Sequence, residues 1–221
     1  MKICLATAKL DQVRWAATNG LIDAVATSPA LLHEAGGNGD PRELLREICR
    51  ESGLPVWAAA GAVNAADIYR EGRELAKVSD QIVVQLPIVE DALGAMHRLS
   101  TEGVPVAAMY AFNAAQALLA AKAGASLVST SVEELEVTGA HGFDIVRELR
   151  RVFDADEAAC DIVASLPRNS AQFAECALAG ADVVTVTPET LRALLLHPLT
   201  DISVDHFLNE LSKHSRSRQP S

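Results

Sequence analysis

The feature that most limits what this 221-residue chain can fold into is a regular alternation of short apolar runs with helical patterns. The apolar runs begin near eight positions: Lys2, Gly20, Pro55, Gln81, Val104, Ser126, Cys160 and Asp182. Runs such as residues 82–86, IVVQL, are apolar on both faces, as expected of strands that pack helices outside and side chains inside. An amphipathic or alanine-rich helical pattern follows each run. Eight such units in succession predict an α/β fold built on a parallel sheet.

An internal repeat supports this succession of equal units. Residues 115–128 resemble residues 171–184, and two strand–helix units account for the offset of 56 residues. Gly124 and Gly180 occupy the same place in the two copies, where a helix C-cap turns the chain into the next strand. A doubly wound open sheet is the alternative, but no GxGxxG follows the first strand, and residues 36–39 lack that spacing. We therefore predict a closed (β/α)8 TIM barrel.

The acidic composition of the chain bears on which kinds of molecule it can bind. With a formal net charge of −10, most of the surface would repel nucleic acid and anionic lipid, so we expect neither as a partner. The apolar run at the N-terminus is too short for a signal peptide core, and no stretch approaches the ~18 apolar residues of a membrane span. We expect a cytoplasmic protein.

The C-terminal region predicts a further helix. We expect one domain over residues 1–211, with an additional helix over residues 200–211 and a polar, disordered tail over residues 212–221. The apolar stripe of this helix consists of Ile202, Val204, Phe207, Leu208 and Leu211. Such a stripe must cover something, either its own barrel or a neighbouring subunit. A homo-oligomer is therefore expected.

Cysteine and histidine spacing gives no sign of a metal or redox site. Cys4, Cys49, Cys160 and Cys176 are far apart in the chain, without a CxxC pair, and are predicted to be buried free thiols. Several ionisable residues lie in predicted loops at the carboxyl ends of the strands: His33, Glu34, Glu90, Glu133, Glu134, Glu136 and His141. No HxH or HExxH motif is present, so we interpret them as solvated loop charges. We expect neither a metal nor a cofactor.

Several segments together carry a family resemblance. They are residues 21–23, 71–77, 116–125, 177–182 and 197–201. From Met1 to about Leu211 the chain resembles the small transaldolases and fructose-6-phosphate aldolases. The resemblance implies a (β/α)8 barrel, a sugar or sugar phosphate as small-molecule ligand, and a C-terminal helix that crosses to a neighbour in a pentamer or decamer.

The resemblance fails at the residue that carries the family's chemistry. A lysine near the end of the fourth strand, in a segment like VVKIP, forms a Schiff base with the substrate ketone in this family. The corresponding segment here, residues 83–87, reads VVQLP, so that Gln85 stands at the lysine position. A carboxamide nitrogen shares its lone pair with the carbonyl and cannot form an imine. The family's route is therefore closed to this sequence.

Other positions of the family's site are also replaced. The positions in question hold Ala6, Ser28, Ala59 and Met109 here, and an arginine that binds the substrate phosphate falls on Glu134. Matching residues remain at Ser129, Ser165 and Arg168, which the resemblance assigns to ligand or phosphate binding. One extra residue, Pro167, precedes Arg168 and leaves open where its side chain is aimed.

Two functional hypotheses follow. The first is a transaldolase-like barrel of carbohydrate-metabolism ancestry without Schiff-base chemistry, acting as a ligand-binding pseudoenzyme or through changed chemistry. The alternative is an active aldol lyase or transferase that uses Lys9 or a metal instead. Trp57 shares the inward face of Ala59, either as lumen packing or as part of the pocket floor. We expect a small and weakly polar pocket at the carboxyl ends of the strands.

Overall fold

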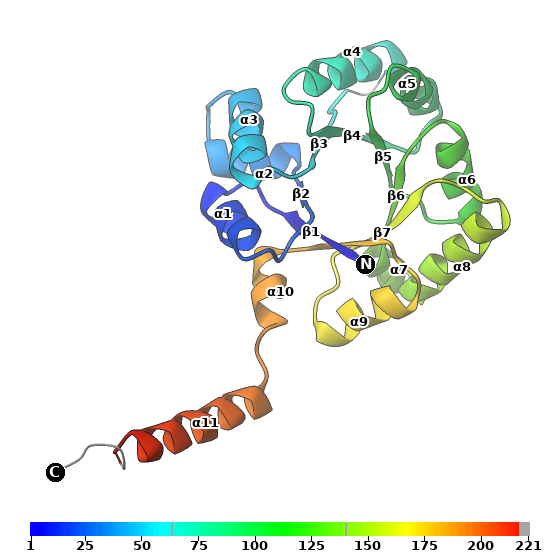
Figure 1. The fold of residues 1–221 in the computed structure, drawn as a ribbon. Helices are drawn as coiled ribbons and strands as arrows, with labels where there is room; N and C mark the ends of the chain where they lie inside the picture. The colour runs from blue at the N-terminus through cyan, green and yellow to red at the C-terminus, as the bar shows by residue number, and fades with distance from the viewer. Residues whose placement is uncertain (63, 140, 217–221) are drawn as a thin grey trace.

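The structure, a computed structural model, describes residues 1–62, 64–139 and 141–216. Its strands run parallel and form a closed barrel, in which each strand pairs with its neighbours in the chain and β1 pairs with β8. The strands are β1 (Lys2–Ala6), β2 (Ala24–Ala26), β3 (Val56–Ala59), β4 (Ile82–Pro87), β5 (Val106–Met109), β6 (Leu127–Ser131), β7 (Asp161–Ser165) and β8 (Val183–Val186). Helices surround this ring on its outer side (Figure 1). The predicted (β/α)8 TIM barrel is confirmed.

Each strand is followed by at least one helix. The helices are α1 (Leu10–Thr18), α2 (Pro29–Gly36), α3 (Pro41–Ser52), α4 (Ala65–Ala76), α5 (Glu90–Thr101), α6 (Ala114–Lys122), α7 (Val132–Val137), α8 (Gly142–Ala155), α9 (Ser170–Leu178), α10 (Pro188–Ala193) and α11 (Pro198–Arg216). Two connections carry a pair of helices, α2 with α3 after β2 and α7 with α8 after β6. These paired connections place extra side chains beside the carboxyl ends of β2 and β6.

The second strand begins later than the sequence pattern predicts. We expected it near Gly20, but β2 begins at Ala24. Gly20 has a φ of +64°, a left-handed conformation that suits glycine and ends the turn after α1. The intervening loop is fastened by Asp23, whose carboxylate accepts a hydrogen bond of 2.8 Å from the Ile3 backbone N–H.

The internal repeat is present in the structure. Asn113 and Asn169 cap α6 and α9 in the same way, each accepting a hydrogen bond from the backbone N–H three residues ahead. Gly124 and Gly180 follow these helices with φ of +98° and +94°. A Cβ at Gly124 would lie 2.5 Å from the Ser100 hydroxyl, so this glycine is required both by its backbone conformation and by the close packing.

A separate cluster of buried side chains fills the lumen of the barrel. Trp57 is its large member, and the others are Cys4, Ala24, Ala26, Val83, Ala107, Val163 and Val183. Along β4, Val83 belongs to this lumen cluster, whereas Val84 belongs to the larger core between the barrel and the helices. The indole of Trp57 is only 3% exposed and is surrounded mainly by small residues. The expected inward orientation of Trp57 is therefore confirmed.

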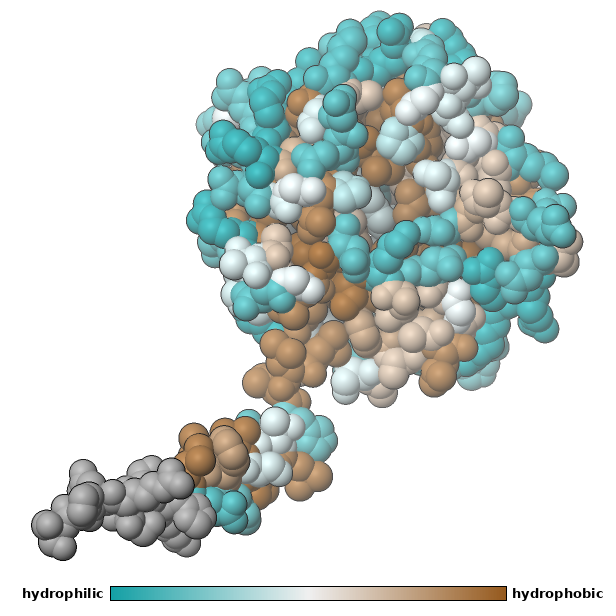
Figure 2. Space-filling model, viewed as in Figure 1, coloured by the Kyte–Doolittle hydropathy of each residue, from teal (hydrophilic) through white to brown (hydrophobic). Residues whose placement is uncertain are grey.

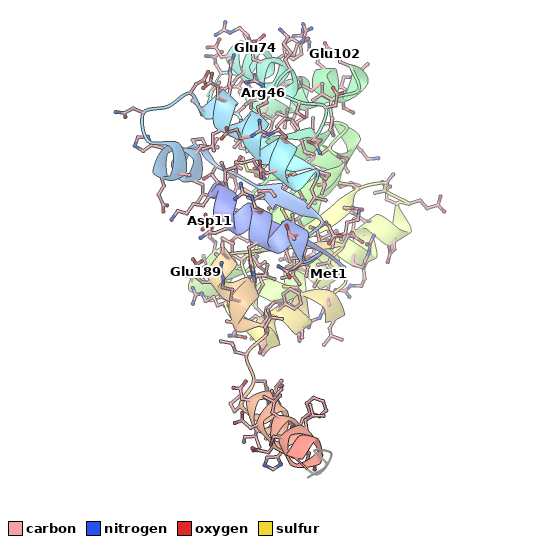
Figure 3. The ribbon with its side chains drawn as sticks, turned by 60° about the vertical axis from the view of Figure 1, so that its left-hand side comes forward. Met1, Asp11, Arg46, Glu74, Glu102 and Glu189 are labelled. Atoms are coloured by element: carbon pink, nitrogen blue, oxygen red, sulfur yellow. The ribbon has the colours of Figure 1, made fainter. Side chains whose placement is uncertain are left out.

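The C-terminal helix stands away from the barrel. After α10 the chain leaves the ring, and α11 projects from it in both ribbon views (Figures 1 and 3). The helix begins two residues before the predicted start and continues to Arg216, so residues 212–216 are helical rather than a disordered tail. Residues 217–221 of the predicted tail lie outside the described residues. Among the helices described, none is both long enough and apolar enough to cross a membrane.

The packing of Trp57 gives a stability prediction. Replacing Trp57 with alanine removes the one large side chain from a lumen lined by small residues, which cannot collapse to fill the space. We expect the variant Trp57→Ala to lower the free energy of unfolding by about 3–5 kcal/mol in urea titrations. Trp15, half-buried on α1 beneath the guanidinium of Arg192, is the matched control, and Trp15→Ala should cost clearly less. Equal costs in the two variants would contradict the lumen role.

Candidate functional site

Gln85 is the polar side chain that extends the lumen toward the carboxyl ends of the strands. It lies two residues beyond Val83 on β4, so strand alternation puts it on the same inward face. Its backbone neighbours in the sheet are Ala59 and Ala107, whose short side chains leave space around it. Gln85 is 8% exposed, and its carboxamide has no hydrogen-bond partner within the described residues. Neither amide atom is among the fully buried unpaired atoms of the described residues, so the carboxamide stays accessible to solvent or to a ligand.

Three hydroxyl groups lie on the same inward face. Ser129 and Ser165 each stand two residues beyond a lumen residue, and their hydroxyl oxygens are 3.1 Å apart. Thr185 follows Val183 in the same way on β8 and is 7% exposed. In the described part of the chain its hydroxyl also has no partner. Together with Gln85 these groups form an uncharged polar layer above the apolar lumen, which we call the mouth layer.

Two cavities flank the barrel on this side. One, of about 160 Å³, is lined by Ala6 together with Lys9, Glu34 and Glu189. The other, of about 260 Å³, is lined by Ala59 together with His33, Arg42 and Glu71. They share no lining residue, so Ala6 and Ala59 do not meet in one pocket. Both cavities are small and have ionisable side chains in their linings.

Lys9 is tied to a carboxylate at the start of α1. Its ammonium nitrogen lies 2.7 Å from Glu34, and its side chain is 47% exposed. The hydrogen bond and the charge of Glu34 raise the pKa of Lys9 above its ordinary value, and the pKa of Glu34 is lowered by the same pair. The amine is therefore held in its protonated form, which is not nucleophilic.

Arg168 is also paired. Its guanidinium donates to the carboxylate of Glu133 at the start of α7, and this interaction raises the pKa of Arg168. The side chain is 58% exposed. Between β7 and Arg168, Leu166 adopts a left-handed φ of +59° immediately before Pro167. The extra proline thus comes with an unusual backbone turn, and the guanidinium behind it is neutralised by an acidic neighbour.

Comparison with known proteins gives the family. Residues 3–219 match the family model described as Transaldolase/Fructose-6-phosphate aldolase. A "Probable transaldolase" of Brucella anthropi is 38% identical over 213 residues, 96% of this chain and 97% of that protein. Proteins of the same description from Thermodesulfovibrio yellowstonii and Phenylobacterium zucineum are each 36% identical, over 96% and 98% of this chain and 99% of their own length. This chain belongs to the transaldolase/fructose-6-phosphate aldolase family.

Membership in the transaldolase family makes the carboxyl ends of the strands the place to look for a site, since barrels of this kind act there. Of the predicted ligand-binding residues, the structure brings together Ser129 and Ser165 and leaves Arg168 at the edge with Glu133. Ser28 is the N-cap of α2, where its hydroxyl accepts a hydrogen bond of 3.2 Å from the Leu31 N–H. Met109 ends β5 and is half-buried.

Two residues of this transaldolase-family mouth were missed in the sequence. Thr185 is hidden in the apolar run VVTV of β8, and only its alternation with Val183 marks it as inward-facing. Tyr110, directly after β5, is 51% exposed and has a left-handed φ of +69°. No motif signals that conformation, because it is rare for a tyrosine and depends on how the loop packs. Such backbone outliers cluster at functional sites.

The cysteine thiols are not available as nucleophiles for the site. All four cysteines are free and buried, as predicted. The pKa of Cys160 is raised to about 12, mainly by burial and to a smaller extent by the carboxylates of Asp161 and Asp182. Burial raises the pKa of Cys176 to about 11. Thiols of this kind stay protonated at neutral pH and are poor nucleophiles.

The loop charges show no clustering suited to a metal. Across residues 1–62, 64–139 and 141–216, no group of three or more His, Cys, Asp or Glu side chains lies close enough together to hold an ion. Instead Glu34 pairs with Lys9, Glu133 pairs with Arg168, and Glu136 lies 3.5 Å from the amide of Gln172.

Proposed function

We propose that this protein is a transaldolase-family member without Schiff-base chemistry, which binds a small neutral polyhydroxyl molecule, such as a sugar, in the mouth of the barrel. The family supplies the sugar ancestry, and Gln85 stands at the position that the sequence resemblance assigns to the Schiff-base lysine. An amide at that position can donate and accept hydrogen bonds but cannot form an imine.

The observation that carries the proposal is the unpartnered amide of Gln85. Gln85 is 8% exposed, and its amide, which makes no hydrogen bond to the described protein, is accessible and free to bond to a ligand. The carboxamide offers two donors and one acceptor, and Ser129, Ser165 and Thr185 add three hydroxyls on the same face. Such a set matches vicinal hydroxyl groups, which also donate and accept.

A neutral ligand is favoured over a phosphorylated one. Arg168, the one cation that the resemblance assigns to phosphate binding, is already neutralised by Glu133. The charge of Glu136 also acts on Arg168, and the chain as a whole carries a net charge of −10. A phosphate dianion would have to displace the carboxylate of Glu133 from Arg168. It would also be repelled by the other acidic groups nearby.

Aldol chemistry by a substitute nucleophile is disfavoured. Lys9 is half-exposed, paired with Glu34, and has a raised pKa, the opposite of the desolvated, uncharged amine that such chemistry requires. Ala6, Ala59 and Met109 offer no group that could accept or donate a proton. These features support a binding protein over an aldolase that has moved its lysine.

Titration calorimetry tests the ligand class. We expect fructose or dihydroxyacetone to bind more tightly than fructose 6-phosphate, and the variant Gln85→Leu to weaken that binding at least about tenfold, through the loss of buried hydrogen bonds. Gln85→Leu should not lower the melting temperature, because it removes an amide that has no hydrogen-bond partner in the described protein. The matched control is Gln81→Leu, just before β4 at the opposite end of the barrel.

Three results would count against this proposal. Tighter binding of the phosphorylated sugar would refute the neutral ligand. Unchanged binding in Gln85→Leu would place the ligand elsewhere, and a large drop in its melting temperature would give Gln85 a structural role instead.

We also propose that the protein is a cytoplasmic homo-oligomer, a pentamer or decamer as the family resemblance implies. Its buried free thiols support a reducing compartment. Figure 2 shows apolar surface on α11, the helix that stands apart from the barrel. Exposed apolar residues of α11 include Leu199 (65%), Ile202 (53%), Phe207 (59%) and Leu208 (55%). A projecting helix with this much apolar surface is expected to pack against a neighbouring subunit.

Light scattering tests the assembly. We expect the wild-type mass to be a multiple of the chain mass at micromolar concentration, and Phe207→Asp to dissociate it, since a charge in an apolar contact is costly. Leu178→Asp is the matched control, because Leu178 is 80% exposed on α9, outside α11. A monomeric wild type would contradict the oligomer, and intact assembly of Phe207→Asp would exclude α11 as the interface.

A further inference from the structure

A further cavity lies at the amino ends of the strands, on the far side from the mouth layer. Its volume is about 280 Å³, and its lining includes Lys2, Ala24 and Val183, the first residues of β1, β2 and β8. In the side view, Met1 at the amino end and Glu189 at the carboxyl end lie on opposite sides of the barrel (Figure 3). We propose that this cavity, the amino-end cavity, is a binding site for a small apolar amine that also carries one hydrogen-bond acceptor.

The inner wall of the amino-end cavity is apolar and contains the indole of Trp57. Ala24, Val83 and Val183 surround it and are each less than a tenth exposed. An apolar cavity of about 150 Å³ is enough to hold benzene, so this one accepts a substituted ring.

The indole supplies a hydrogen-bond donor to this wall. Trp57 as a whole residue is 3% exposed, and its N–H donates to no acceptor in the described chain. The indole nitrogen is not among the fully buried unpaired atoms of the described residues, so it stays accessible to a ligand. Tryptophan N–H groups in largely buried rings usually find a hydrogen-bond partner. A ligand hydroxyl reaching the inner wall would provide one, which is why the proposed ligand carries an acceptor.

The rim of the cavity adds a negative charge. Asp161 is neutralised by Lys2, whose ammonium lies 3.1 Å from it. Asp23 also lines the cavity and accepts a hydrogen bond from the Ile3 N–H, but it forms no ion pair with any cation of the described chain. The pKa of the Cys4 thiol inside the barrel is raised mainly because the thiol is buried, and in smaller part by the negative charge of Asp23. An ammonium group at the rim would meet this unpaired carboxylate.

The two ends of the barrel are separate sites. Cys4, Ala107 and Val163, each at most 1% exposed, fill the lumen between the amino-end cavity and the mouth layer. No residue of the mouth layer lines the amino-end cavity. The proposal therefore does not rest on the proposed sugar site, and the two can fail independently.

Fluorescence of Trp57 tests the site directly. In the variant Trp15→Phe, Trp57 is the only tryptophan, and we expect tyramine to change its emission saturably below about 10 mM. Phenethylamine, which lacks the acceptor hydroxyl, and tyrosol, which lacks the charge, should each bind about three- to tenfold more weakly. Asp23→Asn should remove the advantage of tyramine over tyrosol while keeping an oxygen for the Ile3 N–H.

Filling the cavity gives the decisive comparison. Ser126 lines the cavity and is exposed, so Ser126→Leu, made in the same Trp15→Phe background, should fold and abolish the response. The matched control is Ser170→Leu, at an exposed position at the start of α9, beyond the carboxyl end of β7. Absence of a saturable response to tyramine would overturn the proposal, as would an equal response in Ser126→Leu. Loss of the response in Gln85→Leu, with retention in Ser126→Leu, would place the amine at the mouth layer and also refute it.

Discussion

Pairing of β1 with β8 is the constraint on which the rest of the molecule depends. It joins Cys4 to Thr185 and closes the sheet, so that every strand must turn one face to the lumen and the other to the helices. Because side chains alternate along a strand, closure assigns Val83 and Gln85 to the inside and Val84 to the outside. Both ends of the lumen, with their different chemistry, follow from that assignment.

The lumen divides the barrel into two unlike ends. Trp57 and its small neighbours make an apolar plug. Above the plug, the amide of Gln85 and the hydroxyl of Thr185 have no protein partner among the described residues, and the hydroxyls of Ser129 and Ser165 bond to each other. This arrangement suits a neutral polar ligand. Below it, Asp23 and the indole form a small cavity of opposite character, apolar within and negative at its rim. Charged groups near the carboxyl end, such as Lys9, are held in ion pairs.

Much of the fold could be predicted because strand alternation and helix caps are local signals. The eight units and the repeat capped by Asn113 and Asn169 are examples. The site could be predicted only in part. Which carboxylate neutralises Arg168 depends on α7 lying beside the loop after β7, and the surroundings of Trp57 are lumen residues that come from other strands. These contacts join distant parts of the chain, which no local pattern encodes.

Borohydride trapping tests the central claim that this barrel has kept its scaffold and given up the imine chemistry. The purified protein is incubated with dihydroxyacetone or fructose 6-phosphate and reduced with borohydride, and its mass is measured by mass spectrometry. A sample treated with borohydride in the absence of ketose is the control. The account predicts an unchanged mass, because Gln85 cannot form an imine and Lys9 is kept protonated by Glu34. A ketose-dependent mass increase that maps to a lysine, Lys9 above all, would contradict it.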